Sequence, residues 1–179
     1  PVSLTLKKGP VASTSGTFGN QSFVFSILED ITVPVYDNIA EFNDIAVYEG
    51  VLLTSNFTYT NRNPNQRFIL TNSEIDTNLI SPIVKNNQQS TVSVKYNQQY
   101  SLFEIDKESE MYFIQEIEDE RYELIFGDNV FGKALQEGNF IEVSYITTNG
   151  DSANGINQFT YSGRLVYTRN STEYTVTSG

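Results

Sequence analysis

The octapeptide FIEVSYIT at residues 140–147 decides the fold class of this chain. Its side chains Ile141, Val143 and Tyr145 fall on one face of an extended backbone, and the polar side chains between them fall on the other. Because successive side chains of a β-strand point to opposite faces of the sheet, this alternation predicts a strand. A helix would need an apolar period of 3.6 residues, which this segment lacks.

Similar short segments extend in both directions from this octapeptide. Runs rich in Thr, Val, Ile, Tyr and Phe are separated by Asn, Gly, Pro and Ser, and no window keeps a helical period over three turns. Strands that follow one another without intervening helices favour antiparallel pairing. We therefore expect an all-β fold of mainly antiparallel strands with few or no long helices. Strands are expected at residues 3–7, 23–28, 31–35, 47–59, 67–70, 79–84, 91–95, 112–117, 122–126 and 140–147.

Two features of this pattern predict how strands connect. Pro34 indicates an edge position or a bulge, because proline cannot donate a hydrogen bond to a neighbouring strand. A last hairpin is expected from residues 159–161 and 165–168, joined through Ser162-Gly163.

The segment NRNPN at residues 61–65 is the strongest loop signal in the chain. We take it as the boundary between two small β lobes. The first, residues 1–60, is expected to be the N-terminal lobe of a larger chain, and the second comprises residues 61–179. One continuous domain is the alternative.

The composition limits the chemistry that this chain offers. A formal charge of −11 repels nucleic-acid phosphates and anionic lipids. Cysteine and histidine are both absent, which excludes disulfides, thiol nucleophiles, imidazole-based triads and the usual zinc ligands. The chain starts at Pro1, shows no leader pattern, and has no apolar run near the roughly 18 residues of a membrane span. We expect a segment of a longer soluble polypeptide that is not an enzyme and needs no cofactor.

The octapeptide GDNVFGKA at residues 127–134 nearly matches a phosphate-binding P-loop. Ala134, however, stands in place of the Ser or Thr whose hydroxyl would hold magnesium. A P-loop also opens a helix, whereas Gly138-Asn139 and a further strand follow within a few residues here. The spacing therefore does not predict a nucleotide site.

We interpret the same octapeptide as a tight β-hairpin connection between the expected strands 122–126 and 140–147. Gly127 and Asn129 are expected to adopt a positive φ, which both residue types tolerate, and Gly132 is expected at a bulge.

Two acidic groups are candidates for metal or carboxylate chemistry. Neither has the alternating oxygen ligands and central glycine of a calcium loop. Glu118, Asp119 and Glu120 of the first group are interpreted as the solvated tip of a hairpin between Ile117 and Tyr122, and the second group as loose acidic residues between strands. A glycosidase carboxylate pair stays open, because such pairs are set by separation in space. The two groups are Glu116, Glu118, Asp119 and Glu120, and Asp37, Glu41 and Asp44.

The segment RYELIFGDNVFGK at residues 121–133 resembles the FGDG-x-x-GK signature of baseplate J-like proteins and T4-type phage baseplate wedge proteins. Further similar segments are VYEG at 47–50, NPNQRF at 63–68, GN at 138–139, IEVSY at 141–145, TTNG at 147–150 and NG at 154–155. The resemblance spans at least residues 47–155, and more loosely residues 4–9 and 23–30. Its motif residues are Gly127, Asp128, Asn129, Gly132, Lys133, Gly138, Asn149, Gly150, Asn154 and Gly155.

The resemblance implies an architectural role in a contractile tail. Wedge proteins of this family assemble around the tail hub and rearrange when the sheath contracts. It implies partners among other wedge proteins and further copies of the full-length chain, and a place in the virion after assembly in the bacterial cytoplasm. No nucleic acid, membrane or small-molecule substrate is expected, and the family supplies no catalytic residue.

Two departures from the family pattern limit what the resemblance implies. Asn129 stands where glycine is common, although asparagine also tolerates left-handed backbone. The family's helical region after the Asn-Gly motif is missing, so we expect stable oligomers only of the full-length chain. The alternative function is a carbohydrate- or receptor-binding β-module of a tail fibre or surface protein, although tryptophan, the usual sugar platform, is absent. A hydrolase that uses two carboxylates is a third possibility.

Overall fold

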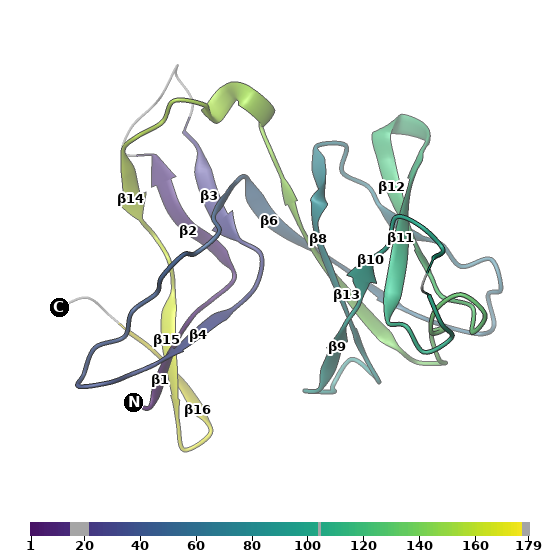
Figure 1. The fold of residues 1–179 in the computed structure, drawn as a ribbon, viewed down its shortest axis with the longest axis horizontal. Helices are drawn as coiled ribbons and strands as arrows, with labels where there is room; N and C mark the ends of the chain where they lie inside the picture. The colour runs from purple at the N-terminus through teal and green to yellow at the C-terminus, as the bar shows by residue number, and fades with distance from the viewer. Residues whose placement is uncertain (15–21, 104, 177–179) are drawn as a thin grey trace. The chain divides into compact units, whose positions relative to one another are not determined.

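The computed structural model describes residues 1–14, 22–103 and 105–176. These residues form an all-β fold of four four-stranded sheets, with the short 3₁₀ turns η1 (Glu118–Glu120) and η2 (Gly150–Ala153) as the helical elements of the described part (Figure 1). The strand pairs of known register are antiparallel, except β10 (Asn97–Gln98) with β11 (Met111–Ile117), which is parallel. The expectation of an all-β, mainly antiparallel fold is confirmed.

The chain divides into two compact units. Unit 1 comprises residues 1–52 and 146–179, and unit 2 comprises residues 53–145. The chain passes between the units within two strands, β6 (Val51–Thr58) and β13 (Phe140–Thr147). This division differs from the predicted boundary after residue 60, since residues 61–65 form turns inside unit 2. Turn-forming residues in a sequence reveal a loop. A chain that passes from one unit to the other within a continuous strand has no such residues at the boundary.

Unit 1 holds two sheets with the strand orders β16-β15-β1-β4 and β14-β2-β3-β5. Pro34 lies in the edge strand β4, as predicted. A small cluster of buried apolar side chains comprises Leu6, Val11 and Ile27, with four partly buried residues against it. The strands are β1 (Ser3–Leu6), β2 (Gly9–Thr14), β3 (Val24–Ile27), β4 (Ile31–Pro34), β5 (Tyr48–Glu49), β14 (Phe159–Tyr161), β15 (Leu165–Arg169) and β16 (Thr172–Thr175).

Gly50 interrupts the long strand predicted over residues 47–59. Its φ is +128°, and a Cβ placed on it would lie 2.2 Å from the carbonyl oxygen of Thr147. The buried Ser26 hydroxyl donates a hydrogen bond of 2.8 Å to the Gly50 carbonyl. A glycine is required here because another backbone segment occupies the space that a side chain would need.

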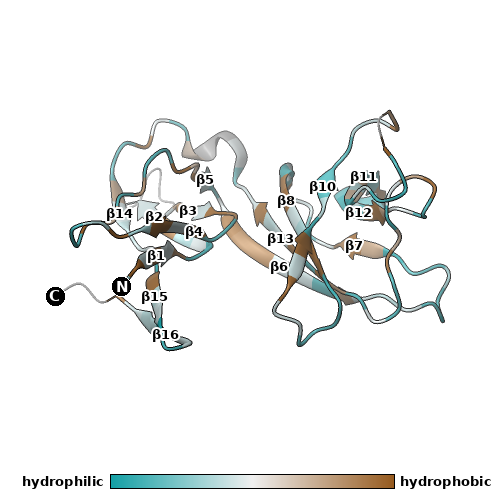
Figure 2. Ribbon diagram, turned by 60° about the horizontal axis from the view of Figure 1, so that its bottom comes forward, coloured by the Kyte–Doolittle hydropathy of each residue, from teal (hydrophilic) through white to brown (hydrophobic). Residues whose placement is uncertain are grey.

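Unit 2 holds the sheet β10-β11-β12-β7 and most of the sheet β6-β13-β8-β9. Its core is larger: twelve buried residues form one cluster, in which Leu70, Ile141 and Val143 are fully buried. Figure 2 shows that the apolar residues follow the strands, whereas the connecting loops are largely hydrophilic. The remaining strands are β7 (Phe68–Leu70), β8 (Ile75–Lys85), β9 (Ser93–Lys95) and β12 (Arg121–Phe126).

The octapeptide at residues 140–147 is strand β13, with the predicted bounds. Ile141, Val143 and Tyr145 pack into the unit 2 core, as their alternation predicted. Ser144, however, is 3% exposed, so the polar face of this strand does not meet water. The reason is position: β13 has a strand on each side in its sheet and cover on both faces.

One predicted hairpin is confirmed and another is wrong. Strands β11 and β12 pair antiparallel from Ile117 and Arg121 outward, joined by η1. Strands β14 and β15 form no hairpin: β14 pairs with β2, and β15 pairs with β1 and β16. Each strand finds its partner in the N-terminal segment, and such pairings are invisible to local patterns.

In the part of the chain that the structure describes, no helix has the length and apolar character needed to cross a membrane.

Candidate functional site

The segment with the strongest functional signal, residues 127–134, forms a closed loop that we call the motif loop. It follows β12 and leads through Gly138-Asn139 to β13. The prediction of a hairpin connection is wrong, because β12 and β13 belong to different sheets. The loop therefore carries the chain from one sheet of unit 2 to the other.

Phe126 anchors the start of the motif loop in the core of unit 2. Its ring meets the ring of Phe68 edge to face at 5.2 Å and the ring of Tyr96 at 5.6 Å. Such edge-to-face contacts between aromatic rings are favourable in addition to the burial of their area. The aromatic residue before Gly-Asp thus has a packing role.

Asp128 and Asn129 are occupied by hydrogen bonds within the loop. The Asp128 Oδ1 accepts the backbone N–H groups of Val130 at 2.9 Å and Phe131 at 2.8 Å. These two hydrogen bonds lower the pKa of Asp128, because they favour its charged form. Asn129 has the predicted positive φ, 68°, and its Oδ1 accepts the backbone N–H of Ala134 at 3.0 Å.

The two glycines of the motif loop lie against each other. A Cβ on Gly127 would be 2.2 Å from the carbonyl carbon of Gly132, so this position excludes every side chain. Gly132 has a φ of +81°, and a Cβ there would approach the Met111 side chain to 2.5 Å. The expected positive φ of Gly127 is not found, because its role is close backbone approach.

The motif loop docks on a second loop, at residues 106–110. The backbone N–H groups of Gly132 and Lys133 donate to the carbonyl oxygens of Asp106 at 3.0 Å and Ser109 at 2.9 Å. The Lys133 ammonium donates to Glu110 at 2.9 Å. This ion pair raises the pKa of Lys133, since the nearby carboxylate favours the charged amine.

Sequence reasoning missed this second loop. Its own turn is held by Asp106, whose carboxylate accepts the Glu108 N–H at 2.9 Å and the Ser109 hydroxyl at 2.9 Å. The Ser109 and Glu108 hydrogen bonds lower the pKa of Asp106. The spacing Asp-x-x-Ser is a turn signal that finds the loop, but nothing in it reveals which segment the loop contacts.

These contacts leave the motif loop unlike a phosphate cradle. Residues 134–139, all of which the structure describes, contain no helix to point its N-terminus at a phosphate. The N–H groups of Asn129, Gly132 and Lys133 are directed at protein acceptors. The motif loop therefore connects β12 to β13 and is held by hydrogen bonds to the loop at residues 106–110.

A cleft of about 370 Å³ lies beside the motif loop and includes Phe68, Phe126 and Leu135 in its walls. Its carboxylates are Asp128 and Glu123. Arg67 binds Glu123 through two hydrogen bonds, of 2.9 and 2.6 Å, which lower the pKa of that carboxyl. Both carboxylates are stabilised in the charged form, which is unsuited to a general acid at neutral pH.

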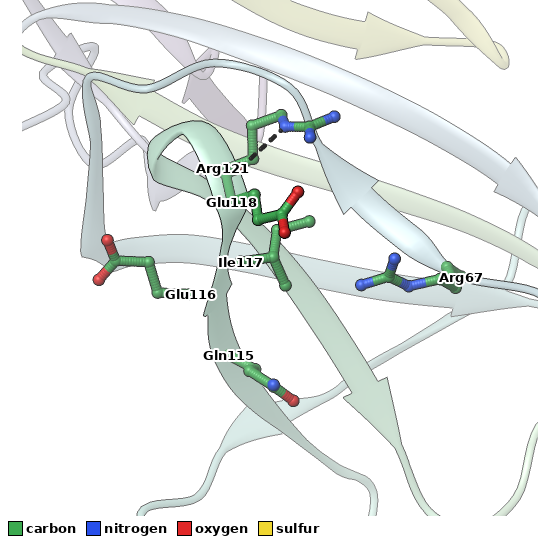
Figure 3. Close-up of a pocket in the computed structure, with 6 residues that line it drawn as sticks. All are labelled: Arg67, Gln115, Glu116, Ile117, Glu118 and Arg121. Carbon is green, nitrogen blue, oxygen red and sulfur yellow. Dashed lines mark hydrogen bonds between the residues drawn. The ribbon is translucent and has the colours of Figure 1, made fainter.

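Glu118, Asp119 and Glu120 lie at the tip of the β11–β12 hairpin, as predicted, whereas Glu116 lies within β11. A pocket of about 390 Å³ lies beside them (Figure 3). Glu116 points to the opposite side of the strand from Glu118 and Arg67. Arg121 donates from Nε to the Glu118 carbonyl oxygen at 3.1 Å. The tip is exposed, and its carboxylates do not converge on one point.

The second acidic group surrounds a turn in unit 1. Tyr36 and Ile39 exchange backbone hydrogen bonds of 2.9 and 2.7 Å, with Asp37 at a positive φ of 48° between them. Asp37 and Glu41 line a cleft of about 450 Å³. Among the described residues, no group of three or more acidic side chains is arranged to hold a metal ion.

The remaining motif residues support turns in both units. In unit 2, the Gly138 N–H donates to the Tyr59 carbonyl at 3.0 Å, and Asn139 is buried. In unit 1, Asn149 donates from its backbone and side chain to the Glu49 carboxylate at 3.0 and 2.8 Å. Gly150 and Gly155 have φ of +60° and +91°, and Asn154 precedes the latter. The ten motif residues are thus divided between the two units, six in unit 2 and four in unit 1.

Neither a scan of protein-family models nor a search of curated proteins found a match to this sequence.

Proposed function

We propose that this chain is a structural, non-catalytic component of a contractile phage-tail baseplate wedge. In this role it assembles around the tail hub and rearranges when the sheath contracts. Its partners are other wedge proteins and further copies of the full-length chain, and its place is the virion, after assembly in the host cytoplasm. No cofactor or small-molecule substrate enters this function.

The observation that carries the proposal is the internal use of the motif loop. Asp128, Asn129 and Lys133 are the residues that a nucleotide or metal site would use. The side chain of each is hydrogen-bonded to another group of this chain. Gly127 and Gly132 serve close packing. A motif in which Asp128 and Asn129 bind the local backbone and Lys133 binds a neighbouring loop fits an architectural protein.

The resemblance of residues 121–133 to the wedge signature supplies the kind of architecture. The all-β fold and the contacts of the motif loop are compatible with that family. Two of the three glycines of the signature, Gly127 and Gly132, stand where the packing leaves no room for a side chain, and Asn129 replaces the third.

Immunoelectron microscopy of virions tests the proposal. Antibodies raised against this chain should label the baseplate of contractile tails in particles from the source of the sequence. A matched antibody against a sheath protein serves as the control for access. Labelling of fibre tips, or of no part of a particle whose sheath is labelled, would contradict the proposal.

The exposed aromatic residues favour a second candidate, a carbohydrate- or receptor-binding module. Tyr36 is 73% exposed, Tyr100 is 78% exposed and Phe103 is 85% exposed, and aromatic rings stack on sugars. A glycan array separates the two candidates. Specific binding that is lost on Tyr36→Ala or Tyr100→Ala supports the module, and a blank array argues against a carbohydrate-binding module.

A further inference from the structure

Among the described residues, no strand pairs with the outer side of strand β16, which therefore forms an open sheet edge. It lies at the end of the order β16-β15-β1-β4, and all four of its residues are exposed. Figure 1 shows β15 and β16 as a hairpin near the C-terminal end of the described chain. An edge strand presents backbone N–H and C=O groups that another strand can pair with.

The known register identifies which groups point outward. The Val176 N–H donates to the Leu165 carbonyl at 2.8 Å, so these two residues form a hydrogen-bonded pair. Hydrogen-bonded and non-hydrogen-bonded pairs alternate along an antiparallel ladder. Tyr174 therefore directs its backbone groups toward β15, whereas Glu173 and Thr175 direct theirs away from it.

Proline and lysine, which often protect sheet edges, are absent from this edge. It contains no proline, glycine or lysine, whereas the opposite edge strand of the same sheet contains Pro34. Its charged residue, Glu173, is bound by Arg164 at 2.7 Å and lies 4.0 Å from the Lys7 ammonium. The edge is thus close to neutral in a chain whose formal charge is −11.

We propose that β16 pairs antiparallel with β16 of a second copy of this chain, about a two-fold axis beside Tyr174. In this register Glu173 lies opposite Thr175 of the other copy, and each such pair exchanges both of its outward hydrogen bonds. A shift by two residues in one direction places Glu173 opposite Glu173, and like charges in that position are destabilising. The sheet continues across the axis from one copy to the other.

The tyrosines supply the side-chain complement of this pairing. Tyr167 and Tyr174 face each other across β15 and β16, and their rings stack with centroids 5.3 Å apart and planes 17° apart. The stack ends at Tyr174, which is 44% exposed. Directly opposed residues lie on the same face of a sheet, so pairing extends the stack to Tyr174 and Tyr167 of the second copy.

Charge and area decide the strength of this association. Two short strands bury less than the roughly 1,200 Å² of stable interfaces, so the dissociation constant should be on the order of 0.1–1 mM. The net charge repels the copies over long distances, and salt screens that repulsion. The pairing should therefore tighten as salt rises from about 0.1 M to about 1 M.

A disulfide trap tests the register. The chain has no cysteine, so every cross-link in a single-cysteine variant comes from the introduced residue. Residues opposed in a non-hydrogen-bonded pair have Cα atoms about 4.5 Å apart, within the range that a disulfide bridges. We expect Tyr174→Cys to form dimers at least about tenfold faster than the exposed control Tyr36→Cys, because pairing raises the local concentration. Equal rates would overturn the proposal.

Sedimentation of the uncross-linked chain gives an independent test. Loading up to about 1 mM should show a reversible monomer–dimer equilibrium. Tyr174→Lys should abolish it, because two ammonium groups would oppose each other. Thr175→Pro should also abolish it by removing an outward N–H, while leaving the pairing with β15 intact. Tyr36→Lys makes the same charge change elsewhere and should leave it unchanged. A dimer that survives Tyr174→Lys, or no dimer at any concentration, would overturn the proposal.

Discussion

The two units of this protein are similar in length but are held together differently. Unit 2 encloses one cluster of twelve buried residues from both of its sheets and the motif loop region. Among the described residues of unit 1, the cluster comprises Leu6, Val11 and Ile27, with partly buried side chains around it. Unit 1 therefore depends more on local fits of the backbone, such as Gly50 against Thr147.

The difference shows that a strand-rich sequence does not by itself produce an even core. Free energy from burial scales with the apolar area removed from water, so the unit that buries more apolar side chains gains more stability from burial. Unit 1 is expected to open more readily than unit 2, because local stability follows the density of buried contacts.

The largest expected effect contrasts a buried leucine in each unit. Leu70→Ala in unit 2 should lower the free energy of unfolding by about 3 kcal/mol or more, since it leaves a cavity in a continuous core. Leu6→Ala in unit 1 should cost about 2 kcal/mol, because its smaller surroundings collapse more easily. Urea unfolding, together with hydrogen exchange of the backbone amides in each unit, measures the loss of unfolding free energy in both variants. Equal losses would remove the contrast between the cores.

The second effect contrasts two crowded glycines. Gly50→Ala should cost about 2 kcal/mol or more, because its Cβ meets a backbone oxygen that cannot move. Gly132→Ala should cost about 1 kcal/mol, since it meets the flexible side chain of Met111. The two variants are compared by urea unfolding.

Glycines without crowding provide the controls for this comparison. Gly9 has a φ of +116° and Gly138 a φ of +83°, and neither has an atom within 4 Å of a Cβ. Their alanine variants report the cost of the backbone angle alone. If Gly9→Ala costs as much as Gly50→Ala, crowding is not the cause.

A smaller effect concerns the ion pair between Lys133 and Glu110, which joins the motif loop to the loop at residues 106–110 in unit 2. Lys133→Ala should lower stability by less than about 1 kcal/mol, because Lys133 and Glu110 are each 38% exposed. A double-mutant cycle with Glu110→Ala isolates the free energy of this ion pair.

Calorimetry should detect no micromolar ATP binding to the unaltered chain. Binding that is lost in Lys133→Ala would restore the P-loop interpretation.

The smallest expected effect is the loss of stability at low pH as two carboxylates become protonated. Burial raises the pKa of Asp30 in unit 1, but hydrogen bonds from the Lys7 side chain and the Lys8 amide outweigh it, and the net pKa is lowered. The backbone N–H groups of Phe131 and Val130 lower the pKa of Asp128 in unit 2. Each carboxylate stabilises the fold above its unfolded pKa, and this contribution is lost as pH falls through the lower folded pKa.

Carboxyl chemical shifts measured during an acid titration check these directions. Asp30 and Asp128 should each titrate below the usual range of an aspartate carboxyl group. Titration of either one above its usual range would show that its hydrogen bonds do not form in solution.

Much of the fold was predictable from local patterns. The strand at residues 140–147, the hairpin with its acidic tip at residues 118–120, and the edge position of Pro34 all follow from alternation and turn chemistry. The motif loop was found by its glycines and its Asp-Asn pair, but its predicted hairpin was wrong. A hairpin and a crossover between sheets have the same local sequence signals.

The sequence by itself determined that this protein is built of β-strands, that it lacks imidazole and thiol chemistry, and that residues 127–134 form a tight turn. Only the tertiary structure decided that β14 and β15 pair with N-terminal strands, that Gly127 must admit the backbone of Gly132, and that the loop at residues 106–110 receives the motif loop. The physical reason is range. Alternation and turn propensity act between neighbours in the chain, whereas strand partners and close packing are selected by the free energy of burying surfaces far apart in sequence.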